Sequence, residues 1–125
     1  MPFSKKELPE TAPSVTSERK TELELFQKHS EIRFKNLSLL NLAFSHRSFA
    51  NESSEEFDNN EKLEFLGDSV LGLAVAEYLY IRLPEKAERK KKKIKSFVVS
   101  EDSLSSIAKD LKIDNFILIG RGEEY

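Results

Sequence analysis

Residues 60–71 read NEKLEFLGDSVL, and this stretch decides both the predicted fold and the candidate site. Apolar residues recur at spacings of three and four through it and beyond it, which predicts a helix from about Asn59 to Leu83. On a helix that turns about 100° per residue, Glu61 and Glu64 are about 60° apart and Glu64 and Asp68 about 40° apart. Glu61 and Asp68 are then only about 20° apart. The three carboxylates therefore share one narrow stripe, which we call the carboxylate stripe.

The carboxylate stripe stands in an otherwise apolar sequence. Apolar residues surround most of the predicted helix, so we expect a central helix that packs on several sides and carboxylates that are partly buried. Three like charges repel one another and burial adds a desolvation cost, so a cation is expected to neutralise them. Mg²⁺ prefers oxygen ligands and keeps waters that it can polarise for phosphodiester hydrolysis. The stripe therefore predicts a magnesium site.

Each of these residues also has a purely structural explanation. Asp58 and Glu61 are three residues apart and resemble a capping box, in which Glu61 would only stabilise the first turn. Asp68 resists this explanation, because Asp is a weak helix former and this one lies beyond the first turn. Gly67 costs roughly 1 kcal/mol relative to Ala inside a helix, which indicates that another helix or a partner subunit packs closely there.

Length and composition restrict the other possibilities. A chain of 125 residues fits one domain with a modest core. It contains no cysteine and only two histidines, which excludes disulfides, thiolate metal sites and cysteine nucleophiles and disfavours a histidine-built metal site. The net charge of −2 argues against a nucleic-acid binder, but cations crowd residues 89–95 while acids cluster around residues 52–58, so the chain is electrostatically polarised.

The pattern predicts an all-α domain after a flexible tail. Residues 1–17 contain three prolines and no apolar run and are expected to be a tail, with the domain over residues 18–125. No apolar run is long enough to cross a bilayer, which needs about 20 residues. His46 and Arg47 are expected to be structural, and residues 116–119 are the one strand-like stretch. The predicted helices are Ser17–Ser30 with Leu23, Leu25 and Phe26 inward, Leu39–Phe44 after Ser38 as N-cap, Asn59–Leu83, Lys86–Val99, and one from Ser100 as N-cap to Leu111.

These segments resemble the ribonuclease III family. Residues 60–71 are similar, almost position for position, to its signature helix. The upstream stretch AFSHRSFANE at residues 43–52, with Leu39 and Leu40 before it, resembles a second family motif. Two downstream stretches, KIKSFVVSE at residues 93–101 and IGRGEE at residues 119–124, continue the likeness.

The resemblance implies an all-α, ribonuclease III endonuclease-type helical domain that homodimerises and binds Mg²⁺, with Mn²⁺ as a substitute. It further implies cleavage of double-stranded RNA by metal-activated water, in rRNA and mRNA processing in the cytoplasm. By matching position, Glu64 and Asp68 would be metal ligands, with Asp68 the central catalytic carboxylate. Glu61 would assist catalysis, Phe65 would be a dimer contact, and Glu88 would be an auxiliary acid.

The chain departs from the family pattern in two places. The resemblance leads us to expect a second acidic motif of the type Asp-x-x-Glu and then an RNA-binding domain after residue 125, so we expect a truncated ribonuclease III domain. A non-catalytic RNA-binding or dimerisation module is the alternative, and a generic helical interaction domain is a third. The run at residues 89–92 is also unusually basic. Lys90, Lys91, Lys92 and Lys93 either hold RNA phosphates or form a solvated helix face.

Overall fold

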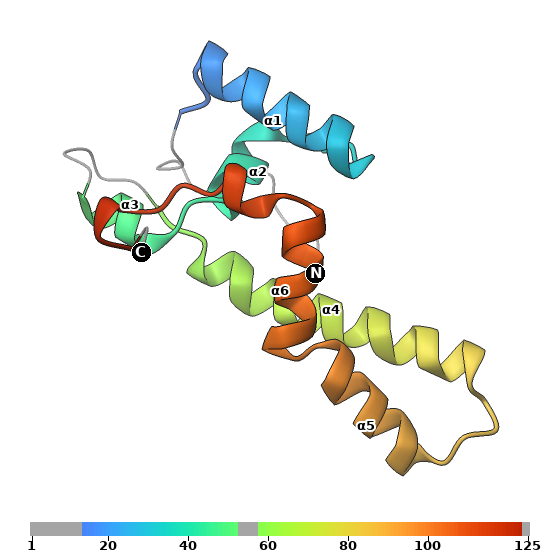
Figure 1. Cartoon of the computed structure of the whole chain (residues 1–125). Helices are drawn as coiled ribbons and strands as arrows, with labels where there is room; N and C mark the ends of the chain where they lie inside the picture. The colour runs from blue at the N-terminus through green and yellow to red at the C-terminus, as the bar shows by residue number, and fades with distance from the viewer. Residues whose placement is uncertain (1–13, 53–57, 124–125) are drawn as a thin grey trace, which may run out of the picture.

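The protein is all-α over the residues that its computed structural model describes, 14–52 and 58–123 (Figure 1). The one extended pairing among these residues is an isolated parallel bridge between Ser45 and Leu118. No helix in the described part of the chain is both long enough and apolar enough to cross a membrane. In chain order the helices are α1 (Ser17–Ser30), α2 (Leu37–Ala43), α3 (Arg47–Glu52), α4 (Glu61–Arg82), α5 (Glu88–Val98) and α6 (Glu101–Asp110), followed by the short 3-10 helices η2 (Ile113–Asn115) and η3 (Arg121–Glu123).

Several predicted helix boundaries are confirmed, because local capping chemistry determines them. The bounds of α1 agree with the prediction, and the Thr16 hydroxyl caps it by accepting from the backbone N–H of Arg19. The Ser100 hydroxyl caps α6 as expected. Ser38 is not the cap of α2, because the Asn36 side chain accepts from the N–H of Leu39 and starts the helix earlier. Most of the predicted tail, residues 1–13, lies outside the described residues.

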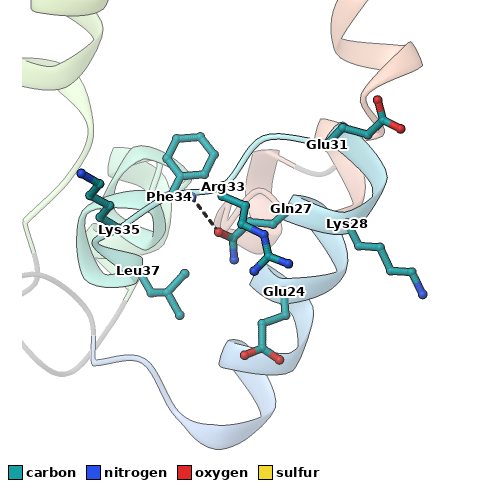
Figure 2. A pocket seen from close by; sticks show the side chains of 8 residues that line it. All are labelled: Glu24, Gln27, Lys28, Glu31, Arg33, Phe34, Lys35 and Leu37. Carbon is teal, nitrogen blue, oxygen red and sulfur yellow. Dashed lines mark hydrogen bonds between the residues drawn. The ribbon is translucent and has the colours of Figure 1, made fainter.

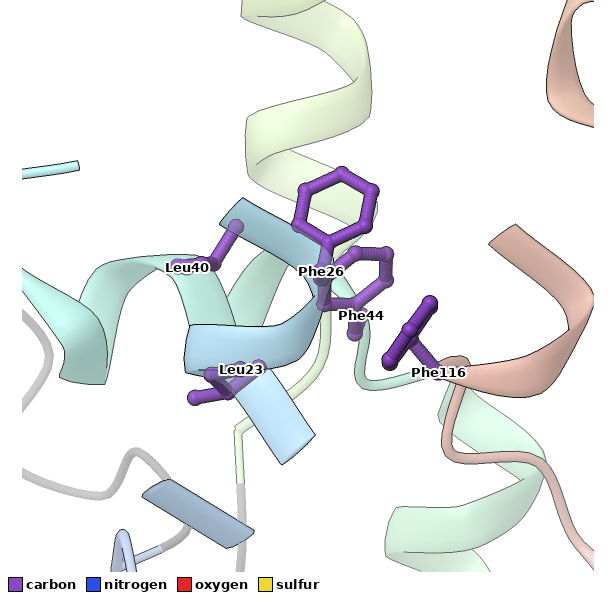
Figure 3. Packing of buried hydrophobic residues seen from close by; sticks show 5 residues of the cluster. All are labelled: Leu23, Phe26, Leu40, Phe44 and Phe116. Carbon is purple, nitrogen blue, oxygen red and sulfur yellow. The ribbon is translucent and has the colours of Figure 1, made fainter. Parts of the chain in front are cut away.

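The core is a small aromatic cluster where α1, α2 and the segment after α6 meet (Figure 3). The ring of Phe26 meets the ring of Phe44 edge-on at 5.0 Å and the ring of Phe116 at 5.3 Å. Leu23 and Leu40 complete the cluster. Such edge-to-face pairs add about 0.5–1.5 kcal/mol each to the free energy gained by apolar burial.

Three residues of α1 were predicted to face the core; this is right for two of them and wrong for the third. Leu23 and Phe26 are buried, but the side chain of Leu25 is 58% exposed. Residues three apart lie on the same side of a helix, whereas Leu25 is turned about 200° from Leu23 and faces away from the core.

A buried arginine joins three parts of the chain around this core. The guanidinium of Arg19 donates to the side-chain oxygen of Asn41 at 2.7 Å and to the backbone carbonyl of Phe116 at 2.6 Å. It also pairs with Glu22 at 2.8 Å and lies over the ring of Phe44 at 5.9 Å. Sequence reasoning missed Arg19, because its partners lie on other elements.

The long helix α4 projects away from the core with α5 antiparallel beside it (Figure 1). We expected α4 to pack on several sides, and within the described residues this is wrong. Leu79 is the one buried residue of α4, while Phe65 is 80% exposed and Leu73 is 69% exposed. A helix that is apolar around most of its circumference needs several partners, and α5 covers one side only.

Candidate functional site

The first turn of α4 is fastened to the turn between α2 and α3. The backbone N–H of Asn60 donates to the carbonyl of Ser45 at 2.9 Å, and the Asn60 side-chain amide donates to the carbonyl of Ala43 at 2.8 Å. These two bonds fix where α4 leaves the core. The carboxylate stripe begins at the next residue, so Asn60 also fixes where the stripe lies.

The capping box that would have given Glu61 a purely structural role is not formed at the start of α4. The carboxylate of Asp58 accepts from the N–H of Asn59, and the Asn59 side chain accepts from the N–H of Glu61 at 3.0 Å. The Glu61 carboxylate instead lies 3.6 Å from the guanidinium of Arg47, with both side chains more than half exposed. Such exposed pairs contribute little to stability. Glu61 is therefore available for a role other than capping.

The carboxylate stripe is exposed rather than buried. Glu61, Glu64 and Asp68 are all exposed, so the expected desolvation is absent among the described residues. Glu64 and Asp68 are four residues apart on one helix, which places their Cβ atoms about 5–6 Å apart. Two hard carboxylates at this spacing fit Mg²⁺, which binds through one or two carboxylates and retains water. Within residues 14–52 and 58–123, no group of three His, Asp or Glu side chains gathers at one point that could hold a metal ion.

An exposed apolar surface lies beside the carboxylate stripe. Phe65 follows Glu64 directly, and Leu66, Val70 and Leu73 continue the surface along α4 with exposed fractions of 59%, 58% and 69%. We call these four residues the α4 apolar face. A Cβ added at Gly67 would meet nothing within 4 Å, so no helix of the described chain packs there. The expectation that another helix packs closely at Gly67 is therefore wrong among the described residues.

The two outer motifs of the sequence meet in a clasp between α3 and the segment at residues 120–122. The carboxylate of Glu52 accepts from the backbone N–H of Arg121 at 2.8 Å and of Gly122 at 3.4 Å. The hydroxyl of Ser48 accepts from the N–H of Gly120 at 2.8 Å. A Cβ at Gly120 would lie 2.7 Å from the Glu52 carboxyl carbon and 2.8 Å from the Ser48 carbonyl oxygen, so only glycine fits.

His46 supports this clasp. Its Nδ1 atom lies 2.6 Å from the Ser48 hydroxyl and accepts from the Ser48 backbone N–H at 3.2 Å. Its own backbone N–H donates to the carbonyl of Leu118 at 2.9 Å. These contacts agree with the structural role expected for His46. Sequence reasoning missed the clasp, although the two glycines on either side of Arg121 were a usable signal of close backbone approach.

The basic run forms α5, and its lysines have different surroundings. The side chain of Lys91 is only 14% exposed, lies 3.5 Å from the Glu88 carboxylate and sits over the ring of Tyr80 at 5.9 Å. Lys95 lies against α4, with its amine 3.6 Å from a Cβ placed at Gly72. Lys90, Lys92 and Lys93 are exposed. Glu88, the candidate auxiliary acid, is exposed and pairs with Lys91.

A large pocket lies elsewhere, between α1 and the segment that leads into α2 (Figure 2). Its volume is about 800 Å³. The side-chain oxygen of Gln27 accepts from the N–H of Phe34 at 2.8 Å on its wall. The lining mixes cations with the carboxylates of Glu24 and Glu31 and includes none of the predicted site residues. The pocket is therefore separate from the carboxylate stripe.

Comparison with known proteins agrees with the motifs. The family model "Ribonuclease-III-like" matches residues 36–125. Ribonuclease 3 of Treponema denticola is 55% identical over 106 residues, which cover 85% of this chain and 43% of that protein. Ribonuclease 3 of Borreliella afzelii is 50% identical over 109 residues, which cover 87% of this chain and 44% of that protein. The chain thus spans less than half the length of these relatives.

The fold agrees as well. A solved nuclease domain of ribonuclease III from Campylobacter jejuni, described as structurally flexible in a region involved in dimer formation, superposes with a TM-score of 0.72 at 39% identity. The match covers 82% of this chain and 68% of that one. The helical fold, the signature stretch on α4 and the match over residues 36–125 lead to one conclusion: this chain belongs to the ribonuclease III family.

Proposed function

We propose that this chain is part of an endoribonuclease that hydrolyses phosphodiester bonds of double-stranded RNA. The observation that carries the proposal is the exposed pair Glu64 and Asp68 on one face of α4, in a chain of the ribonuclease III family. Two free carboxylates one helical turn apart repel one another and are stabilised by a divalent cation. The chain contains no cysteine, so a site built from oxygen ligands is the chemistry that its residues supply.

Glu64 and Asp68 are the residues that would hold Mg²⁺, or Mn²⁺ in its place. The metal, when bound, would supply a polarised water as the nucleophile for hydrolysis. Asp68 would be the central catalytic carboxylate by its matching position in the family's signature helix. It lies beyond the first turn, so no capping role explains it. Glu61 would assist from the same stripe, held by Arg47, and Glu88 is a weaker auxiliary acid.

A second copy of this chain would cover the α4 apolar face. The exposed fraction of Phe65, 80%, is unusual for so large an apolar side chain, and exposed patches of this kind mark interaction sites. In a two-fold dimer the same surface serves both subunits, so Phe65 of each copy would insert into the other.

The cellular role that we propose is processing of rRNA and mRNA precursors in the cytoplasm. It rests on family membership and on the proposed substrate class. The alternative function is a non-catalytic ribonuclease III-like module for RNA binding or dimerisation. The observation that favours this alternative is that the described residues form no group of three His, Asp or Glu side chains that could hold a metal ion.

The deciding experiment is Asp68→Asn in the full-length gene product. We expect cleavage of duplex RNA to fall by more than about 100-fold, because even partners of metal ligands are worth about 10–100-fold, while RNA affinity is retained. Glu77→Gln is the matched control, since Glu77 is an exposed carboxylate on the same helix but outside the stripe. Unchanged cleavage by Asp68→Asn would refute the enzymatic proposal, and absence of cleavage in the wild-type protein would favour the non-catalytic module.

A further inference from the structure

Helix α5 carries a dense positive charge that the described residues do not neutralise. Its sequence, ERKKKKIKSFV, has six cations and one acid. The acid, Glu88, pairs with Lys91, and no other cation of α5 has an ion pair within residues 14–52 and 58–123. Like charges one turn apart destabilise a helix by about 0.2–0.5 kcal/mol per pair. An anionic partner on this helix would remove that repulsion.

The packing of α5 on α4 separates five of its six cations into two groups. Lys91 and Lys95 line a groove of about 400 Å³ between the helices, together with Leu79 and Tyr80 of α4. Lys92 also lines this groove but is exposed, so it belongs to neither group. Lys91 is largely buried there, with its amine over the Tyr80 ring. Its apolar stem covers α4, as long cationic side chains often do. We call Lys91 and Lys95 the groove lysines.

Three other cations of α5 point away from this groove. On a helix of about 100° per residue, Arg89 and Lys93 are about 160° away from Lys91, and Lys90 is about 100° away. All three are exposed and without an ion pair among the described residues. Arg89 and Lys93 are four residues apart, so they stand one turn apart along the axis, about 6 Å. We call Arg89, Lys90 and Lys93 the outer cations.

Deepening the proposed function, on which this inference rests, we propose that the outer cations bind the phosphate backbone of the duplex RNA substrate, whereas the groove lysines are structural. A row of cations on a rigid helix suits recognition of the phosphate backbone and of helix shape rather than sequence, because the deep, narrow major groove of A-form RNA hides the base edges from side chains. The outer cations also lie in the same α4–α5 hairpin as the carboxylate stripe (Figure 1). The negative charge of the stripe itself repels phosphates. The outer cations thus supply the affinity that the stripe cannot.

The test compares two double variants with the same change in charge. Lys90→Ala with Lys93→Ala removes two outer cations, and Lys91→Ala with Lys95→Ala removes both groove lysines. Alanine is a strong helix former, so α5 is retained in both. The affinity of each protein for a 25-base-pair RNA duplex of arbitrary sequence is measured by fluorescence anisotropy in EDTA, from about 50 to 300 mM KCl.

We expect the outer variant, Lys90→Ala with Lys93→Ala, to bind every duplex sequence more weakly than wild type. The slope of log K against log salt should be smaller by about 2, near one unit per lost phosphate contact. The groove variant, Lys91→Ala with Lys95→Ala, should keep the wild-type slope and have a lower Tm. Equal slopes in all three proteins, or a larger change in the groove variant, would overturn the inference.

Two further outcomes separate this inference from the function itself. If the wild-type protein binds duplex RNA and the outer variant has the same salt slope, the inference is wrong and the proposed function is unaffected. If the wild-type protein does not bind duplex RNA, both the inference and the proposed function are wrong. A variant effect seen with anionic lipid vesicles or polyglutamate, but not with RNA, assigns the outer cations to another partner.

Discussion

The guanidinium of Arg19 donates a 2.6 Å hydrogen bond to the backbone carbonyl oxygen of Phe116, 97 residues further along the chain. The residue is buried, with 8% of its surface exposed, and the same guanidinium holds Asn41 on α2. One side chain therefore joins the beginning of the described chain to the segment that follows α6. The aromatic core lies directly beneath this junction, since Arg19 also covers the Phe44 ring.

We predict that Arg19→Met lowers the free energy of unfolding by about 2–4 kcal/mol. Methionine keeps the apolar stem but removes every donor, and each buried hydrogen bond that is lost costs about 1–3 kcal/mol. Urea unfolding monitored by circular dichroism measures the change. Lys20→Met, at an exposed position of the same helix, is the control and should stay within about 0.5 kcal/mol of wild type. A similar loss in both variants would show that Arg19 has no special role.

The same substitution should have opposite effects at two glycines, because Gly120 lies in the clasp and Gly67 lies in open space on α4. Gly120→Ala should destabilise the protein by about 1–3 kcal/mol, because its Cβ would press on Glu52 and Ser48. Gly67→Ala should stabilise the isolated subunit by about 0.5–1 kcal/mol, because the site is helical and open. Thermal unfolding at low protein concentration compares them. Stabilisation by Gly120→Ala would mean that the clasp is not formed.

Phe65→Ala should weaken self-association of the chain by at least about 30-fold, the effect of losing an interface hot spot of about 2 kcal/mol. Sedimentation velocity over a concentration series measures the dissociation constant. Phe97→Ala, at a site that is 75% exposed on α5, removes a ring of the same size outside the α4 apolar face and should leave association unchanged. If the wild-type chain is monomeric at every concentration, or if both variants behave alike, the proposed dimer surface is wrong.

Metal binding by the carboxylate pair can be followed without any cleavage assay. Mn²⁺ titrated into isotope-labelled protein should broaden the amide resonances of the first turns of α4 before others, since Glu64 and Asp68 share that face. Asp68→Asn should abolish this local broadening, whereas Asp102→Asn, at an exposed carboxylate in the first turn of α6, should preserve it. Broadening that is centred away from α4 in the wild type would remove the metal assignment.

Much of this protein follows from local sequence alone. The periodicity around residues 60–71 predicted α4, and the Ser100 hydroxyl predicted the start of α6, because helix periodicity and capping depend on residues a few positions apart. The placement of Glu64 and Asp68 on one stripe follows from the same helical geometry. The short helix α3 escaped prediction, since six residues without a capping signal give no periodic pattern.

Only the tertiary structure decided which side chains are satisfied and which are free. Arg19 with Phe116, and Glu52 with Arg121, pair across 97 and 69 residues, and no local pattern encodes such partners. Lys91 and Lys93 are equivalent in sequence, yet the packing of α5 on α4 buries the first and exposes the second. The sequence by itself determined the helices and the carboxylate stripe, because backbone geometry acts locally. Burial and long-range hydrogen bonding depend on how the helices pack, so these were decided by the tertiary structure.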